Sequence, residues 1–77
     1  MSDKATRDHA ERLLRAASNE TRRNSRDVGF YLNGERIGCL ADSGSVYASP
    51  WEWVADKVGP PTRTYDNGRY ASWLVAS

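Results

Sequence analysis

The sequence predicts an α+β fold in which an antiparallel sheet of four or five strands carries two helices on one face. Two turn signals predict the strands, because Asn33-Gly34 and Asn67-Gly68 each separate two short apolar segments in the manner of a β-hairpin. Helix-like spacing near the N-terminus and a Ser-Pro start in the centre predict the helices. The expected order is α-ββ(β)-α-ββ, and at 77 residues the whole chain, 1–77, is expected to form a single small domain.

The first predicted helix spans residues 2–18, and Ser2 or Asp3 can cap it. Apolar and small side chains recur every three to four residues and form a broad face. This face consists of Ala5, His9, Ala10, Leu13, Leu14 and Ala17.

Residues 19–27 contain no apolar side chain and are rich in arginine. Asn19 favours the left-handed conformation that ends many helices. We therefore expect a polar connecting loop here, with a frayed extension of the first helix as the alternative.

Residues 28–41 form the clearest predicted element, a hairpin with a two-residue turn at Asn33-Gly34. Such a turn places Phe30 opposite Ile37 and Val28 opposite Cys39. Alternation then predicts one apolar face and one polar face. The apolar face would hold Val28, Phe30, Leu32, Ile37 and Cys39, and the other face Tyr31 and Arg36. Residues 46–48 are a candidate short third strand.

The second predicted helix begins with Ser49 as its cap, and Glu52 completes a capping box. It is expected to run to about Val58, because Gly59 and two prolines follow. Trp51, Val54, Ala55 and Val58 share one side of it.

Residues 62–75 form the second predicted hairpin, around Asn67-Gly68. The expected cross-strand pairs are Tyr65 with Tyr70, Thr64 with Ala71 and Thr62 with Trp73. Both faces carry apolar groups, with Tyr65, Tyr70 and Leu74 on one and Ala71, Trp73 and Val75 on the other. Over the whole chain, the predicted core is Leu13, Phe30, Ile37, Trp51, Val54, Val58 and Trp73.

The sequence offers little material for catalysis, so we expect no enzyme, no metal and no cofactor. His9 and Cys39 are the single histidine and the single cysteine, which is too few for a common zinc site. A lone cysteine is typical of a reducing compartment. No apolar run has the length of a membrane span and the N-terminus is charged, so a cytoplasmic protein without a membrane partner is expected.

A protein-binding surface is the first functional hypothesis. On the second helix, Trp53 is displaced by roughly 200° from Trp51 and shares its side with Asp56 and Lys57. An aromatic side chain ringed by charges is typical of an interface anchor. The polar hairpin face with Tyr31 and Arg36 is a second candidate protein-binding surface. The alternative for Trp53 is packing into a core that is otherwise poor in large aliphatic residues. A homodimer or a partner complex would also complete that core.

Nucleic-acid binding is the alternative function. Arg22, Arg23 and Arg26 cluster in the polar segment, and sheet tyrosines such as Tyr65 and Tyr70 have rings on which bases could stack. Against this hypothesis, eleven basic residues are nearly balanced by ten acidic ones, which leaves a net charge of +1.

In its small size, composition and lack of catalytic groups, the chain resembles small phage-encoded host-takeover proteins of the anti-CRISPR type. The resemblance implies a cytoplasmic protein, in the host if phage-encoded, that occupies a surface of a bacterial defence complex. It rests on no residue pattern and therefore assigns no residue a role. The expected function is non-catalytic binding to a larger protein or ribonucleoprotein complex, which is thereby inhibited or adapted.

Overall fold

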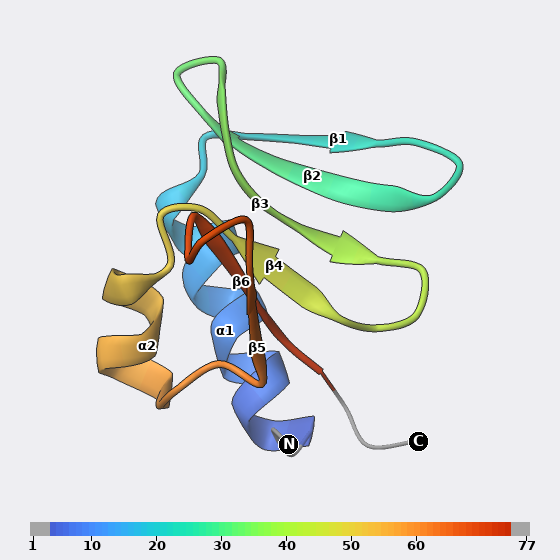
Figure 1. Cartoon of the computed structure of the whole chain (residues 1–77). Helices are drawn as coiled ribbons and strands as arrows, with labels where there is room; N and C mark the ends of the chain where they lie inside the picture. The colour runs from blue at the N-terminus through green and yellow to red at the C-terminus, as the bar shows by residue number, and fades with distance from the viewer. Residues whose placement is uncertain (1–3, 75–77) are drawn as a thin grey trace.

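The computed structural model describes residues 4–74, which form two helices and one six-stranded antiparallel sheet (Figure 1). The α+β class and the predicted order of the helices are confirmed, with one more strand than the upper estimate. The elements are α1 (Lys4–Ala17), β1 (Glu20–Arg23), β2 (Asp27–Leu32), β3 (Glu35–Ala41), β4 (Val46–Ala48), α2 (Glu52–Val58), β5 (Arg63–Tyr65) and β6 (Tyr70–Trp73). The strand order across the sheet is β1-β2-β3-β4-β6-β5. Ser2, Asp3 and Val75 lie outside the described residues.

The extra strand is β1, and it corrects the prediction of a connecting loop over residues 19–27. All four β1 residues are exposed, so no apolar pattern marked them as a strand. Asn19 fixes the start of β1 to the neighbouring hairpin, because its side-chain amide donates to Asn33 Oδ1 at 3.0 Å. The side-chain oxygen Oδ1 of Asn19 accepts the Asn33 backbone N–H at 3.1 Å.

A tight turn then joins β1 to β2. The side-chain oxygen of Asn24 accepts the backbone N–H groups of Arg26 and Asp27, both at 2.9 Å. The Asn24 backbone N–H also donates to the Asp27 carbonyl at 3.0 Å. Polar residues thus build this turn through local side-chain hydrogen bonds.

The β2–β3 hairpin has the predicted turn, with positive φ at Asn33 and Gly34, but only part of the predicted register. Tyr31 lies opposite Arg36 as expected. An irregularity between Phe30 and Tyr31 then shifts the pairing, so that Phe30 lies opposite Gly38, not Ile37. Val28 correspondingly lies opposite Leu40, and Cys39 opposite Gly29. Cys39 is therefore on the face opposite Phe30, contrary to the prediction, because a bulge reverses the alternation beyond it.

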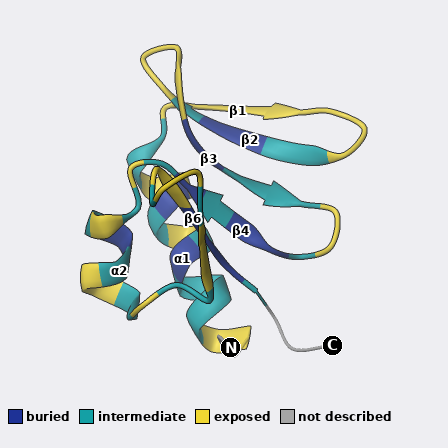
Figure 2. Ribbon diagram, viewed as in Figure 1, coloured by how far each residue is buried: buried dark blue, intermediate teal, exposed yellow. Residues whose placement is uncertain are grey.

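Helix α1 covers one face of the sheet, and α2 packs beside α1. In the view of Figure 1, α1 crosses behind β4 and β6. Dark bands in Figure 2 mark the core between α1 and the strands. Of the predicted core, Phe30, Ile37, Val54 and Trp73 are buried, whereas Leu13, Trp51 and Val58 pack against it half-buried. The buried hydrophobic residues that the prediction lacked are Ala10, Leu14, Val46, Ala48 and Ala71.

Helix α2 ends at Val58 as predicted but starts later than expected. Its N-cap is Trp51, which makes no side-chain capping hydrogen bond. The Ser49 hydroxyl donates instead to the Arg69 carbonyl at 3.1 Å, which ties the chain to the turn before β6. The predicted capping box is therefore wrong, because the Ser49 side chain is used in a tertiary contact.

The β5–β6 hairpin confirms the pairs Tyr65 with Tyr70 and Thr64 with Ala71. Trp73 is fully buried and its indole N–H donates to the Gly59 carbonyl at 3.2 Å. Tyr70, on the opposite face, is exposed. The two sides of this strand therefore meet different surroundings.

Candidate functional site

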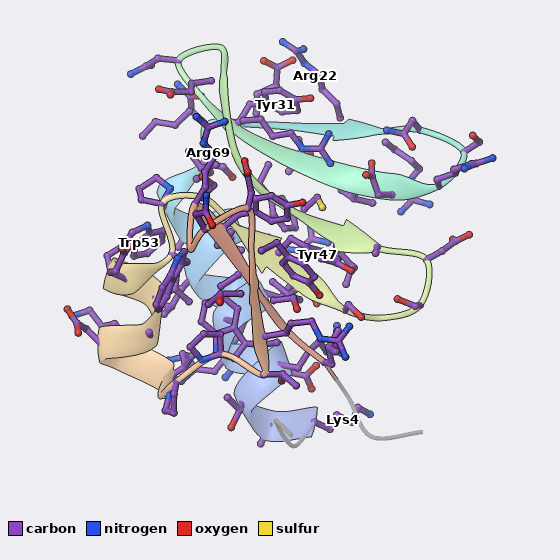
Figure 3. The ribbon with its side chains drawn as sticks, viewed as in Figure 1. Lys4, Arg22, Tyr31, Tyr47, Trp53 and Arg69 are labelled. Atoms are coloured by element: carbon purple, nitrogen blue, oxygen red, sulfur yellow. The ribbon has the colours of Figure 1, made fainter. Side chains whose placement is uncertain are left out.

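The face of the sheet opposite α1 is not covered by either helix. It carries all four tyrosines of the chain, one on each of the strands β2, β4, β5 and β6. The strand register places Arg22, Arg36 and Arg63 on the same face. We call the surface formed by Tyr31, Tyr47, Tyr65, Tyr70, Arg22, Arg36 and Arg63 the tyrosine face. Figure 3 shows Tyr31 beside Arg22, and Tyr47 on the lower strands.

Three tyrosines form a cluster at one end of this face. The Tyr65 and Tyr70 rings stack with centroids 5.0 Å apart, and Tyr47 lies 5.9 Å from Tyr65. The Tyr65 hydroxyl is hydrogen-bonded at 2.9 Å to Ser72, which is fully buried beneath the rings. Partial burial, with Tyr65 nearby, raises the pKa of the Tyr47 phenol. The cluster thus presents neutral aromatic groups held in fixed positions.

Tyr31 and Arg22 form a second cluster near the β1 edge. The Arg22 guanidinium lies 4.1 Å from the centroid of the Tyr31 ring, within the range of a cation–π interaction. Arg22 Nε also donates to Glu20 Oε2 at 2.9 Å, and this hydrogen bond lowers the pKa of Glu20. Gly29 lies below the Tyr31 ring, since a Cβ there would come within 2.8 Å of Tyr31 Cε1. The missing side chain allows the ring to lie flat on the sheet.

Arg36 lies between the two clusters and is held by an ion pair. Its Nη2 donates to Asp27 Oδ2 at 2.8 Å. The hydrogen bonds from Arg36 and from Asn24 lower the pKa of Asp27. The guanidinium is thereby fixed over the sheet.

A pocket of about 350 Å³ opens on the tyrosine face between Arg36 and the tyrosine cluster. Its lining is mostly apolar, and Cys39 and Tyr47 contribute side chains to it. Burial raises the pKa of the Cys39 thiol, so the thiol is protonated and weakly nucleophilic at neutral pH. The lining residues are Arg36, Ile37, Gly38, Cys39, Tyr47, Ala48, Ser49 and Tyr70.

The arginines around this face are largely neutralised by carboxylates of the same chain. Arg22 pairs with Glu20 and Arg36 with Asp27, and Arg69, in the turn between β5 and β6, lies 3.5 Å from Asp66. Such pairs leave guanidinium planes exposed without a strong net charge. The surface is therefore arginine-rich but not strongly basic.

The predicted anchor on α2, Trp53, lies at the border between core and surface. Trp53 is half-buried and packs against the core cluster, as does Trp51. Asp56 and Lys57 are exposed beside it. This contact with the core agrees with the alternative that the sequence left open for Trp53, and its role as an interface anchor stays a prediction.

The two candidate groups of the nucleic-acid hypothesis are not brought together. Arg22, Arg23 and Arg26 lie on β1 and its turn, at one edge of the sheet, whereas Tyr65 and Tyr70 belong to β5 and β6 at the other. Arg23 and Arg26 line a separate polar pocket of about 310 Å³. This pocket is lined by β1, β2, β3 and the turns beside them, whereas the tyrosine cluster lies on β4, β5 and β6.

Tyr47 was not predicted as a site residue, and Cys39 was predicted on the wrong face of the sheet. Tyr47 stands between two small apolar residues in a three-residue strand, and that alternation already indicated an outward tyrosine. Cys39 had no such signal, because the bulge that turns it outward leaves no mark in the hydrophobic pattern. His9, on α1, and Cys39 lie on opposite sides of the sheet, so they do not form a pair.

Within residues 4–74, no cluster of three or more His, Cys, Asp or Glu side chains could hold a metal ion. Neither of the two helices described in that range has the length and apolarity to cross a membrane. No protein-family model, curated protein sequence or solved structure matches this chain.

Proposed function

We propose that this protein is a non-catalytic binding protein that docks its tyrosine face on a larger protein or ribonucleoprotein complex and thereby inhibits or adapts it. One observation carries the proposal: all four tyrosines lie on the sheet face without helices, among arginines that are mostly paired.

The composition of this face favours a protein partner. Tyrosine and arginine are enriched at the centres of protein interfaces, whereas lysine is depleted. Both lysines of the chain, Lys4 and Lys57, lie on the helices and not on the sheet. Tyrosines that are already stacked lose little conformational freedom on binding, which preserves affinity. The pocket beside Arg36 and Tyr47 has the size to receive one apolar side chain of a partner.

The resemblance in size and composition to anti-CRISPR-type proteins supplies one specific version of this proposal. In that version, the partner is a bacterial defence complex in the host cytoplasm, and binding blocks its active surface. The tyrosine face is then the blocking surface.

The experiment is affinity capture from a bacterial lysate with matched surface variants. The wild-type chain is expected to retain a defined partner at stoichiometric amounts, also after nuclease treatment. Tyr70→Ala should lose the partner, because Tyr70 is exposed on the face, whereas Asp56→Ala on α2 should retain it. Equal capture by both variants would exclude the tyrosine face as the interface.

A second candidate function, binding to single-stranded nucleic acid, is favoured by the stacked Tyr65–Tyr70 pair with Arg63 on the same strand as Tyr65. Fluorescence anisotropy with single-stranded oligonucleotides tests it. Phosphate contacts would give a steep fall in affinity with salt, whereas a protein interface of paired charges would not. Because few arginines here are unpaired, we expect weak binding of the oligonucleotides.

A further inference from the structure

We infer that β1 pairs antiparallel with the β1 strand of a second copy, around a two-fold axis at Thr21, and that the two six-stranded sheets thereby become continuous. This inference does not rest on the proposed function. It concerns the edge of the sheet, and its outcome can be measured with the purified protein alone.

β1 is the outermost strand and, among the described residues, has β2 as its strand neighbour on one side only. Figure 1 shows it at the upper edge of the sheet. The outer main-chain N–H and C=O groups of an edge strand are a template for another strand. All four side chains of β1 are exposed, so no packed group stands in the way of a second strand.

The faces of β1 restrict how two copies can pair. Glu20 and Arg22 lie on the tyrosine face, because they are opposite Tyr31 and Gly29, whereas Thr21 is opposite Phe30 and lies on the other face. A two-fold axis perpendicular to the sheet places the tyrosine faces of the two copies on the same side. Side chains that lie directly opposite each other in an antiparallel pair point to the same face. The axis must therefore pass through a residue of β1 and not between two residues.

Only one central register pairs opposite charges. With the axis at Thr21, Glu20 lies opposite Arg22 of the second copy, and Arg22 lies opposite its Glu20. The Glu20–Arg22 pair within each copy is then joined by two such pairs between the copies. With the axis at Glu20 or at Arg22, identical charges lie directly opposite each other, which is destabilising. The short strand ETRR is therefore self-complementary in a single register.

The dimer would place both tyrosine faces on the same side of the continuous sheet, with the two Arg22–Tyr31 clusters close to the axis. A partner with repeated sites would then be bound at two points, which increases avidity without new contacts. Since the paired strands are short and polar, we expect a weak dimer that requires a high protein concentration.

The test is sedimentation equilibrium with charge-reversed variants. Wild-type protein is expected to dimerise, and Glu20→Arg and Arg22→Glu should each weaken the dimer about tenfold or more, because each creates two like-charge pairs. An equimolar mixture of the two variants should form a heterodimer, because Arg at position 20 then faces Glu at position 22. Circular dichroism verifies that each variant is folded.

Disulfide trapping tests the register independently. In a Cys39→Ser background, Thr21→Cys places two thiols opposite each other on the axis, where the Cα separation suits a disulfide. Oxidation should give a covalent dimer, whereas Thr64→Cys on the other sheet edge should remain monomeric.

Three results would overturn the inference. One is a wild-type monomer at all concentrations up to about 1 mM. Another is a dimer whose dissociation constant does not change in the charge-reversed variants. The third is cross-linking at position 64, which would indicate association through β5.

Discussion

The two faces of the sheet differ in the size and the chemistry of their side chains. The row of residues facing α1 runs through Phe30, Gly38, Ala48 and Ala71, and three of these are small. The adjacent row on the other face runs through Gly29, Cys39, Tyr47 and Ser72. Neighbours along each strand therefore alternate between a side built for close packing and a side that displays aromatic rings.

The small residues explain how a thin core is made. Leu14 of α1 lies directly on Gly38, since a Cβ there would come within 2.9 Å of a Leu14 methyl carbon. Close approach of the helix lets few large side chains fill the space between the layers. The fully buried apolar side chains of the sheet thus face the helices, whereas the rings of the tyrosine face are half-buried or exposed.

The largest expected effect is on β6, where one substitution on each face of the strand tests the difference between the two faces. Trp73→Ala should destabilise the fold by about 3–5 kcal/mol, the usual cost of emptying a fully buried aromatic site. Tyr70→Ala, three residues away on the other face, should cost only about 1 kcal/mol for the lost ring stacking. It should instead weaken partner binding by at least ~2 kcal/mol. Thermal or urea unfolding and a binding titration measure both. Equal loss of stability in the two variants would show that the tyrosine face belongs to the core.

A pair of glycine substitutions tests the packing directly. Gly38→Ala should destabilise the protein by about 3 kcal/mol, because the new Cβ would lie 2.5 Å from the Tyr47 carbonyl oxygen, which is backbone and cannot swing away. Gly29→Ala is the matched control in the neighbouring strand, where the Cβ meets only the end of the Tyr31 side chain. It should cost less than about 1 kcal/mol.

Urea denaturation of the two glycine variants gives the comparison. If Gly29→Ala proved as costly as Gly38→Ala, the Tyr31 ring would be held as rigidly as the backbone. The rings of the tyrosine face would then be fixed in position before any partner binds.

The sequence was sufficient wherever a turn or an alternation determines the structure. Both Asn-Gly turns, their adjacent pairs and the end of α2 at Gly59 follow from local backbone preferences, and the structure confirms them. Trp73 and Phe30 were predicted core residues because alternation placed them on an apolar face.

The sequence was insufficient where tertiary contacts decide. β1 has no apolar pattern, and hydrogen bonds of Asn19 and Asn24 hold its two ends beside β2. The bulge beside Phe30 likewise leaves no mark in the hydrophobic pattern. The sequence indicated Tyr31, Tyr65 and Tyr70 as sheet tyrosines, but not that Tyr47 joins them on one face. The members of the tyrosine face are scattered over all six strands, and the strand order that unites them requires β6 to pair with β4.

The two tryptophans of α2 are expected to contribute less to stability than Trp73. Both Trp51→Ala and Trp53→Ala should destabilise the fold, each by roughly half of the ~3–5 kcal/mol of a fully buried aromatic residue, because both are half-buried. Trp51→Phe should still cost about 1 kcal/mol, since the indole N–H donates to the Gly68 carbonyl at 2.8 Å. Chemical denaturation monitored by circular dichroism measures these changes. If Trp53→Ala left stability unchanged but abolished partner binding, the interface would lie on α2 and not on the tyrosine face.

The smallest expected effect concerns Arg36, which forms one wall of the pocket. Because Arg36 and Asn24 hydrogen-bond to Asp27, the pKa of Asp27 is below its ordinary value of 3.8. A lowered folded-state pKa means that the ion pair stabilises the fold above the unfolded-state pKa, and that this contribution is lost as the pH falls through the folded-state pKa. Arg36→Gln should raise the pKa of Asp27 towards 3.8, measured by a carboxyl NMR titration. The pKa of Glu20, lowered by Arg22, is an internal control that should not move. If the pKa of Asp27 did not change, Arg36 would not be anchored, and the pocket would form only when a partner orders this side chain.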